Sequence, residues 1–97
     1  MEEKASSEFS AEAIRIFKAL SDPTRYRMVR MLLNCNELGC VELEKAFDLS
    51  KPAMSHHYRV LENAGLLSSR KEGVYVYFRL DKERLERFLP GFDQAHL

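Results

Sequence analysis

The sequence predicts a single, mainly α-helical domain that carries one β-hairpin, in the element order ααααββα. Apolar residues recur at helical spacing in four segments before residue 65, alternate with period two over residues 74–80, and return to helical spacing after residue 81. Pro, Gly, Asp and Ser mark the breaks between these segments. With 97 residues, of which 45% are hydrophobic, residues 1–97 can build one core and are too few for a second domain.

The N-terminal part of the chain carries signals for two helices. Ser10 is the predicted N-cap of a first helix that reaches Leu20. Asp22 stands directly before Pro23, and this pair predicts the start of a second helix, because Asp caps well and the first helical residue needs no N–H. The polar residues 34–39 are expected to end that helix.

Two more helices are expected in the middle of the chain. A short third helix runs from about residue 40 to Phe47, and a fourth runs from its N-cap Ser50 to Ala64. Gly65 is the expected left-handed C-cap of the fourth helix.

The hairpin and the last helix follow. Strands are expected at residues 67–71 and 74–80, joined by a turn at Glu72-Gly73. Asp81 opens the last helix, and Pro90-Gly91 ends it. At the two ends of the chain, residues 1–9 are expected to be flexible and residues 91–97 to form a flexible tail.

The third and fourth helices form a pattern that is typical of nucleic-acid binding. They are separated by a break of about three residues, and the outer face of the fourth helix is polar and rich in hydroxyl groups, as in a helix-turn-helix. A hairpin directly after such a helix is typical of a wing, which completes a winged helix-turn-helix. Although the net charge is zero, residues 50–80 hold five Lys or Arg against two Glu, whereas residues 1–12 hold four Glu against one Lys. The basic stretch is where phosphate contacts are expected.

Three segments of the sequence resemble the ArsR/SmtB family of winged-helix repressors. They read FKALSDPTRYRMVRMLL in the first two helices, LSKPAMSHHYRVLENAGLL in the fourth helix and RKEGVYVYFRL in the hairpin. The resemblance covers about residues 17–80, and the second segment is the specific one. It implies a dimeric, DNA-binding transcriptional repressor whose fourth helix enters the major groove.

The resemblance also implies which residues contact duplex DNA. They are Ser50, Lys51, Pro52, Ser55, His56 and Arg59 on the helix, and Arg70, Lys71, Gly73 and Tyr75 on the wing. The chemistry agrees, because Lys and Arg bond guanine or phosphate, Ser and His bond bases or phosphates, and proline can contact a thymine methyl group. His56 could instead be a solvated surface residue, and Tyr75 could belong to a solvated strand face.

Other residues near this motif have plainer interpretations. His57 shares the apolar face of its helix and is expected to be a core histidine rather than a ligand. Arg25, Arg27 and Arg30 are expected to form a solvated face, although these basic side chains of the second helix could contact DNA phosphates.

Apolar residues left over at both ends of the chain predict a homodimer through the first and last helices. The candidates are Phe9, Ile14, Ile16, Leu85, Phe88, Leu89 and Phe92. A twofold dimer requires an inverted-repeat operator with half-sites about 34 Å apart or a multiple of that distance. The alternative is that these side chains cap the core of their own subunit.

The metal sites of the family are not reproduced. Many members use paired cysteines in an ELCVCDL-type stretch, but the corresponding residues 37–43 read ELGCVEL, and the last helix begins Asp81-Lys82-Glu83 without a histidine. We therefore expect no metal and no other cofactor, and keep a metal-responsive repressor with a non-standard site as an alternative.

Cys35 and Cys40 suggest a thiol redox switch. A helix N-terminus lowers a thiol pKa, and a turn between helices could bring two Cα atoms within the roughly 4.4 to 6.8 Å that a disulfide needs. Oxidation could then tilt the third helix, with Cys40 as the attacked residue. The alternative is that one or both cysteines are small buried apolar residues.

Several classes of protein are disfavoured. No Ser/His/Asp or Cys/His arrangement, glycine-rich phosphate loop or paired-carboxylate motif predicts an enzyme. No apolar run of about 18 residues and no export signal is present, and two cysteines fit a reducing compartment, so a cytoplasmic protein without membrane contact is expected. A winged-helix module that binds only proteins is the remaining alternative to a DNA-binding regulator. The inducing signal, whether oxidant, metal or small molecule, stays open.

Overall fold

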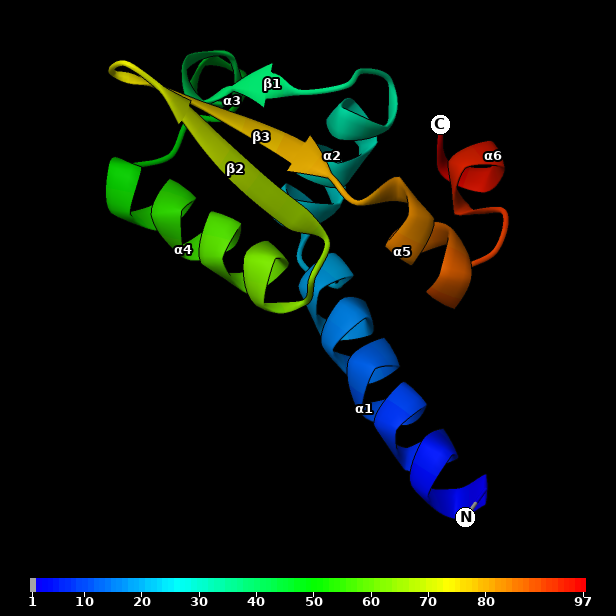
Figure 1. Ribbon diagram of the computed structural model, residues 1–97. Coiled ribbons are helices and arrows are strands. Elements are labelled where there is room, and N and C mark those ends of the chain that lie inside the picture. The colour runs from blue at the N-terminus through cyan, green and yellow to red at the C-terminus, as the bar shows by residue number, and fades with distance from the viewer. Residues whose placement is uncertain (1) are drawn as a thin grey trace.

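The computed structural model describes residues 2–97, with side chains from residue 8 onward (Figure 1). Its elements are α1 (Glu2–Leu20), α2 (Pro23–Leu33), β1 (Leu38–Gly39), α3 (Cys40–Ala46), α4 (Lys51–Asn63), β2 (Leu67–Glu72), β3 (Tyr75–Leu80), α5 (Lys82–Phe88) and α6 (Phe92–His96). The predicted order of helices and hairpin is confirmed, with β1 and α6 as additions.

The predicted N-caps form as expected. The Asp22 carboxylate accepts hydrogen bonds from the backbone N–H groups of Thr24 and Arg25, and the Ser50 hydroxyl accepts one from the N–H of Ala53. Asp81 caps α5 in the same way. These side chains accept hydrogen bonds from backbone N–H groups that have no acceptor within the helix, and in this way they fix where each helix begins.

The sheet has three antiparallel strands in the order β1-β3-β2. In the hairpin Leu67 lies opposite Leu80 and Glu72 lies opposite Tyr75, so the turn is Gly73-Val74, one residue later than predicted. Gly73 has a φ of 61°, which glycine adopts without steric cost and which a tight two-residue hairpin needs. The two residues of β1 pair with Phe78 and Tyr77 of β3, and so short a strand has no periodicity that a sequence pattern could reveal.

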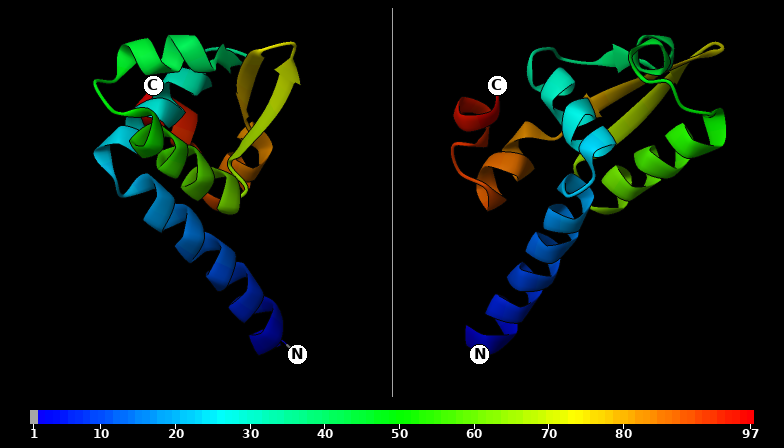
Figure 2. Two further views of the ribbon diagram at one scale, coloured as in Figure 1. Left: turned by 90° about the vertical axis from the view of Figure 1, so that its left-hand side faces the viewer. Right: turned by 180° about the vertical axis from the view of Figure 1, so that it is seen from behind.

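Both ends of the chain differ from the expectation. Helix α1 begins at Glu2 instead of Ser10, because no proline or glycine interrupts the sequence before Ser10, and it extends away from the body of the molecule (Figures 1 and 2). At the other end, the expected tail contains α6, whose Phe92 is buried and packs edge-on against Tyr26 of α2.

The core lies between the C-terminal half of α1, the helices α2 to α5 and the sheet. Its most deeply buried large side chains are Ile16, Met28, Val29, Leu32, Leu43, Met54, Leu61, Leu66 and Leu85. Among the described side chains no polar or charged residue is buried. None of the helices in the described part of the chain is both long and apolar enough to cross a membrane.

Candidate DNA-binding surface

The first half of α4 and the tip of the hairpin lie at the same end of the molecule, opposite the end that carries α6 (Figures 1 and 2). Helix α4 is oriented by one apolar face, on which Met54, Tyr58 and Leu61 are buried at helical spacing. Tyr58 also stacks on Phe78 of β3, with ring centroids 4.2 Å apart, which ties the hairpin to the helix. The opposite face of α4 is therefore turned outward.

The predicted DNA contacts of α4 all lie on this outward side. The exposed residues are Ser50, Lys51, Pro52, Ser55, His56 and Arg59. Ser50 has a second role, because its hydroxyl is the N-cap of the helix. A charged, hydroxyl-bearing and exposed first half of a helix is what readout of base edges in a major groove requires. Contact with DNA stays a prediction for each of these residues.

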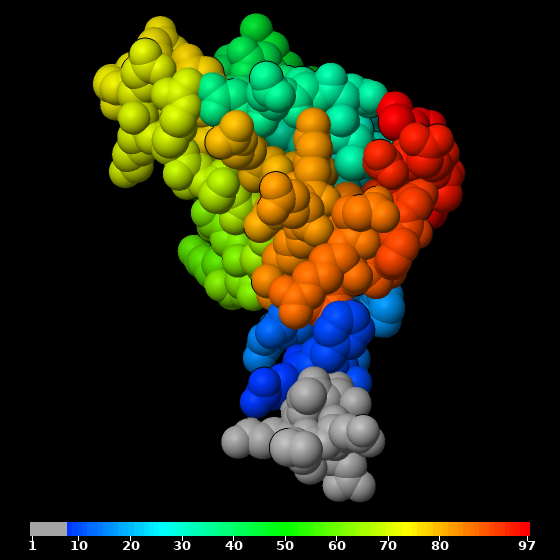
Figure 3. All heavy atoms as spheres, turned by 45° about the vertical axis from the view of Figure 1, so that its right-hand side comes forward, coloured from blue at the N-terminus to red at the C-terminus, as the bar shows by residue number. Residues whose placement is uncertain are grey.

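The hairpin projects from the body of the molecule (Figure 3, yellow). Lys71, Gly73 and Tyr75 are exposed as predicted, and Val74 at the tip is 90% exposed. Arg70 is exposed too, but it is not a free cation. Its guanidinium donates hydrogen bonds to the carboxylates of Glu37 and Glu72.

Two carboxylates surround the Arg70 guanidinium and offset its charge. Hydrogen bonds from Arg70 hold the pKa of Glu37 below its ordinary value, so this carboxylate stays ionised and offsets the charge of Arg70. The guanidinium also lies over the ring of Tyr77, 4.6 Å from its centroid. Arg70 thus braces the wing on the segment before β1, which the sequence did not predict.

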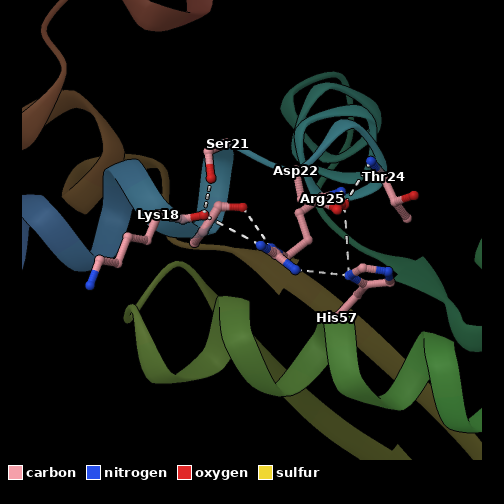
Figure 4. Close-up of polar contacts among 7 residues, drawn as sticks. Lys18, Ser21, Asp22, Thr24, Arg25 and His57 are labelled. Carbon is pink, nitrogen blue, oxygen red and sulfur yellow. Dashed lines mark hydrogen bonds and ion pairs between the residues drawn. The ribbon is translucent and has the colours of Figure 1, made fainter.

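A polar cluster joins three helices behind the outward face (Figure 4). Arg25 of α2 donates through Nε to the carbonyl of Ala19 at 2.7 Å and through a terminal nitrogen to Nδ1 of His57 at 3.0 Å. A second terminal nitrogen reaches the carbonyl of Lys18 at 3.3 Å. Each of the three guanidinium nitrogens of Arg25 thus donates one hydrogen bond, and the half-buried side chain is not part of the expected solvated face.

His57 is half-buried, close to the expected core histidine, but it is a hydrogen-bonded one. Burial lowers the pKa of His57, the Asp22 carboxylate at 3.8 Å opposes this, and the Arg25 guanidinium lowers the pKa further. The net direction is downward, so His57 is neutral at neutral pH and its Nδ1 can accept from Arg25. Burial alone would raise the pKa of Asp22, but the backbone N–H and the charge of Arg25 outweigh it and lower that pKa.

A second arginine makes a similar junction at the C-terminal end of α4. Arg84 of α5 donates to the carbonyl of Ala64 at 3.2 Å and to the carboxylate of Glu12 on α1 at 3.1 Å. Gly65 leaves room for it, because a Cβ there would lie 2.5 Å from Nε of Arg84. Sequence patterns missed both arginine junctions, since their partners are far apart along the chain.

The predicted dimer residues divide into two groups. Ile16, Leu85, Phe88 and Phe92 are buried in the core of their own subunit, as in the alternative given above, and have little surface left to bury against a partner. Phe9 and Ile14 of α1 are 45% and 50% exposed, and Leu89 is half-buried. Phe17, which was not predicted, joins the exposed residues of α1 at 53%.

The two cysteines are free thiols with different partners. Cys35 donates to the carbonyl of Met31 at 3.5 Å, whereas Cys40 donates to the carboxylate of Glu44 at 2.9 Å and lies 3.9 Å from the hydroxyl of Tyr58. Burial raises the pKa of the Cys40 thiol, and Glu44 raises it further. This corrects the expectation that the start of α3 lowers it, because the adjacent carboxylate opposes a thiolate.

In the part of the chain whose side chains are described, no three His, Cys, Asp or Glu side chains gather as a metal site would require. On α3, Cys40 and Glu44 form a hydrogen-bonded pair.

The known proteins to which this chain is similar are transcriptional regulators. A profile described as "Bacterial regulatory protein, arsR family" matches residues 22–69. The chain is 43% identical over 68 residues to the arsenic resistance transcriptional regulator ArsR1 of Pseudomonas putida, covering 70% of this chain and 53% of that protein. The chain thus spans about half the length of that relative. It is 35% identical to the transcriptional repressor SdpR of Bacillus subtilis, covering 73% of this chain and 78% of SdpR.

Solved structures agree with these relatives. HlyU from Vibrio cholerae superimposes with a TM-score of 0.68 at 34% identity, covering 82% of this chain and 94% of HlyU. Residues 22–69 contain the helix-turn-helix and the start of the hairpin, so the matched region is the one that builds the outward surface of α4. The resemblance seen in the sequence is confirmed, and the chain belongs to the arsR family of bacterial regulatory proteins.

Proposed function

We propose that this protein is a transcriptional regulator that binds duplex DNA and represses by occupying its operator. The observation that carries the proposal is the division of α4 into two faces. Met54, Tyr58 and Leu61 fix the helix to the core, while Lys51, Ser55 and Arg59 are left exposed on the other side. A helix held in this way can enter a major groove without rearranging.

The roles within the surface follow from chemistry. On this proposal the exposed Ser55, His56 and Arg59 read base edges, and the exposed Lys51 near the start of α4 contacts phosphate or guanine. Lys71 and the Gly73-Val74 tip of the wing would contact the backbone or the minor groove beside the site. Repression, the sign of regulation, is supported by the similarity to the transcriptional repressor SdpR and by steric exclusion at a promoter.

We further propose that two copies pair through α1 and bind an inverted repeat. Phe9, Ile14 and Phe17 leave three large apolar side chains about half exposed on a helix that extends from the body of the molecule. Pairing these faces would bury them, and twofold symmetry would place two α4 helices on half-sites about 34 Å or a multiple apart.

Sedimentation tests the pairing. The wild-type chain is expected to sediment as a dimer, and the double variant Ile14→Glu, Phe17→Glu as an 11.3 kDa monomer, because the two charges added to each α1 helix oppose burial. A wild-type protein that sediments as an 11.3 kDa species at micromolar concentration contradicts the pairing.

Selection from a random-sequence duplex library tests DNA binding without a guess about the operator. The full chain is expected to enrich an inverted repeat, and its affinity for the selected duplex, measured by fluorescence anisotropy, is expected to fall steeply as salt rises. A library that shows no enrichment, together with binding that does not respond to salt, would remove the DNA-binding proposal and leave the protein-interaction module.

A further inference from the structure

We infer that Arg25 and Arg84 are positioning residues that hold α4 at a fixed angle to α1, so that both support DNA binding without touching DNA. The inference rests on the proposed function. It starts from the two arginine junctions, which come from α2 and α5 and yet join the same pair of helices, α1 and α4.

The two junctions hold α4 at different points along its length. Arg25 connects the last turn of α1, through the carbonyls of Lys18 and Ala19, to His57 in the middle of α4. Arg84 connects Glu12, two turns earlier in α1, to the carbonyl of Ala64 at the end of α4. Two attachments at separate points restrain rotation of one helix against the other, which a single attachment does not.

The bonds are specific to arginine. The last carbonyls of a helix have no partner within it, and a planar guanidinium offers several N–H donors in fixed directions, so one side chain can serve two helices at once. Because Arg25 and Arg84 are both partly shielded from water, these bonds are screened less than those of a surface pair. A lysine ammonium also has three N–H donors, but they leave a single nitrogen atom, so it could not hold both helices in the geometry that the planar guanidinium fixes.

Neither junction lies on the surface proposed to meet DNA. His57 is half-buried on the inward side of α4, and Ala64 is buried at its C-terminal end. The proposed base contacts lie on the outward side of the first half of the helix. The arginines therefore act through the placement of α4. In the proposed dimer two copies pair through the exposed apolar face of α1. The angle between α1 and α4 then determines how far apart the two α4 helices lie.

The junction at His57 also predicts a pH dependence. The groups that face its imidazole are Arg25 and Asp22 from α2 and His56 from its own helix, while the Lys18 ammonium points away (Figure 4). Protonation would turn Nδ1 from an acceptor into a donor, break the bond to Arg25 and place two cations side by side, with Asp22 as their counter-charge. Since the pKa of His57 is lowered, the junction is complete above the ordinary histidine value of 6.5 and is lost as the pH falls through the lower value in the folded protein.

The test uses the full chain and the duplex recovered by selection, with the variants Arg25→Gln and Arg84→Gln and the exposed Arg15→Gln of α1 as a matched control. We expect roughly tenfold weaker binding for the first two, and an unchanged slope of log Kd against log salt, because no phosphate contact is removed. Both should also accept duplexes with altered half-site spacing. A slope reduced by about one would identify a phosphate contact instead and overturn the inference, as would wild-type affinity with wild-type spacing preference.

His57→Asn separates positioning from general stability. Asparagine can offer an acceptor oxygen near the place of Nδ1 but cannot be protonated, so this variant should keep wild-type affinity at neutral pH and lose the fall in affinity at acidic pH. If it follows the wild-type pH profile, His57 is not the titrating group and the junction does not have this role. Should Arg25→Gln fail to fold, Arg25→Lys replaces it, and wild-type affinity in that variant counts against the inference.

Failure of the proposed function is recognised separately, because then the wild-type chain enriches no duplex. The inference is judged in that case on the free protein by residual dipolar couplings, which report the angle between α1 and α4. A changed or averaged angle in Arg25→Gln, with an unchanged one in Arg15→Gln, supports it. Identical angles in both variants overturn it.

Discussion

Helix α4 and the hairpin lie at the same end of the molecule, and both expose basic side chains, but they hold their charges differently. On α4, Lys51 and Arg59 are exposed and make no hydrogen bond or ion pair with another described side chain. On the hairpin, Arg70 is bonded to two carboxylates, Glu37 and Glu72. The cations of α4 are therefore unpaired within the described protein, whereas the Arg70 cation of the hairpin is already paired with carboxylates of the same chain.

The difference shows that exposure alone does not identify a binding residue. Before a cation paired with carboxylates can neutralise a phosphate, its ion pairs must break, or the carboxylates must stay close to the negatively charged phosphate. An unpaired cation on α4 has no such cost beyond its own hydration. We therefore expect binding energy to be concentrated on α4, with the wing contributing through shape, Lys71 and the Gly73-Val74 tip.

The largest effect is expected on α4. Arg59→Gln should weaken binding to the selected duplex by about 1 to 3 kcal/mol, and should reduce the salt slope by about one if the partner is a phosphate. Fluorescence anisotropy at several salt concentrations measures both quantities. Arg87→Gln on α5, near the opposite end of the molecule, is the control and should bind as the wild type does. Equal losses in the two variants would contradict a site centred on α4.

An intermediate effect is expected where the brace of the wing is released. Glu37→Gln removes a carboxylate that pairs with Arg70, so the variant should bind DNA more tightly than wild type at low salt, with a steeper salt dependence. The double variant Glu37→Gln, Arg70→Gln should lose that gain. Weaker binding by Glu37→Gln would mean that the Arg70–Glu37 ion pair contributes more to DNA binding, by holding the hairpin in place, than an unpaired Arg70 cation would.

The smallest effect is expected at Cys40, behind the surface. Burial and Glu44 raise its pKa, so at pH 8 the folded chain should be alkylated by iodoacetamide at Cys40 more slowly than the urea-unfolded chain. Mass spectrometry of the alkylated peptides measures the rate. Glu44→Gln should speed the reaction in the folded chain. Fast alkylation of wild-type Cys40 would return support to the redox switch that the sequence suggested.

Local sequence patterns account for the helices, the hairpin and the chemistry of the outward surface. Capping residues such as Asp22, Ser50 and Asp81 act on backbone groups only a few residues away, so their effect can be seen in the sequence. Helical spacing separated the buried face of α4 from its polar face for the same reason. The family resemblance then predicted which residues of that surface contact DNA, and the matched residues 22–69 confirm the family.

Local patterns do not show which polar and apolar side chains have partners within the subunit, because those partners come together only in the folded chain. Arg25 lies 32 residues before His57, Arg70 lies 33 residues after Glu37, and Arg84 lies 72 residues after Glu12. Phe88 and Phe92 have the predicted helical spacing, but their side chains are buried in the core of their own subunit. The exposed apolar face is on α1 instead. Local patterns report the period of an element, whereas pairing across elements depends on how the folded chain brings distant residues together.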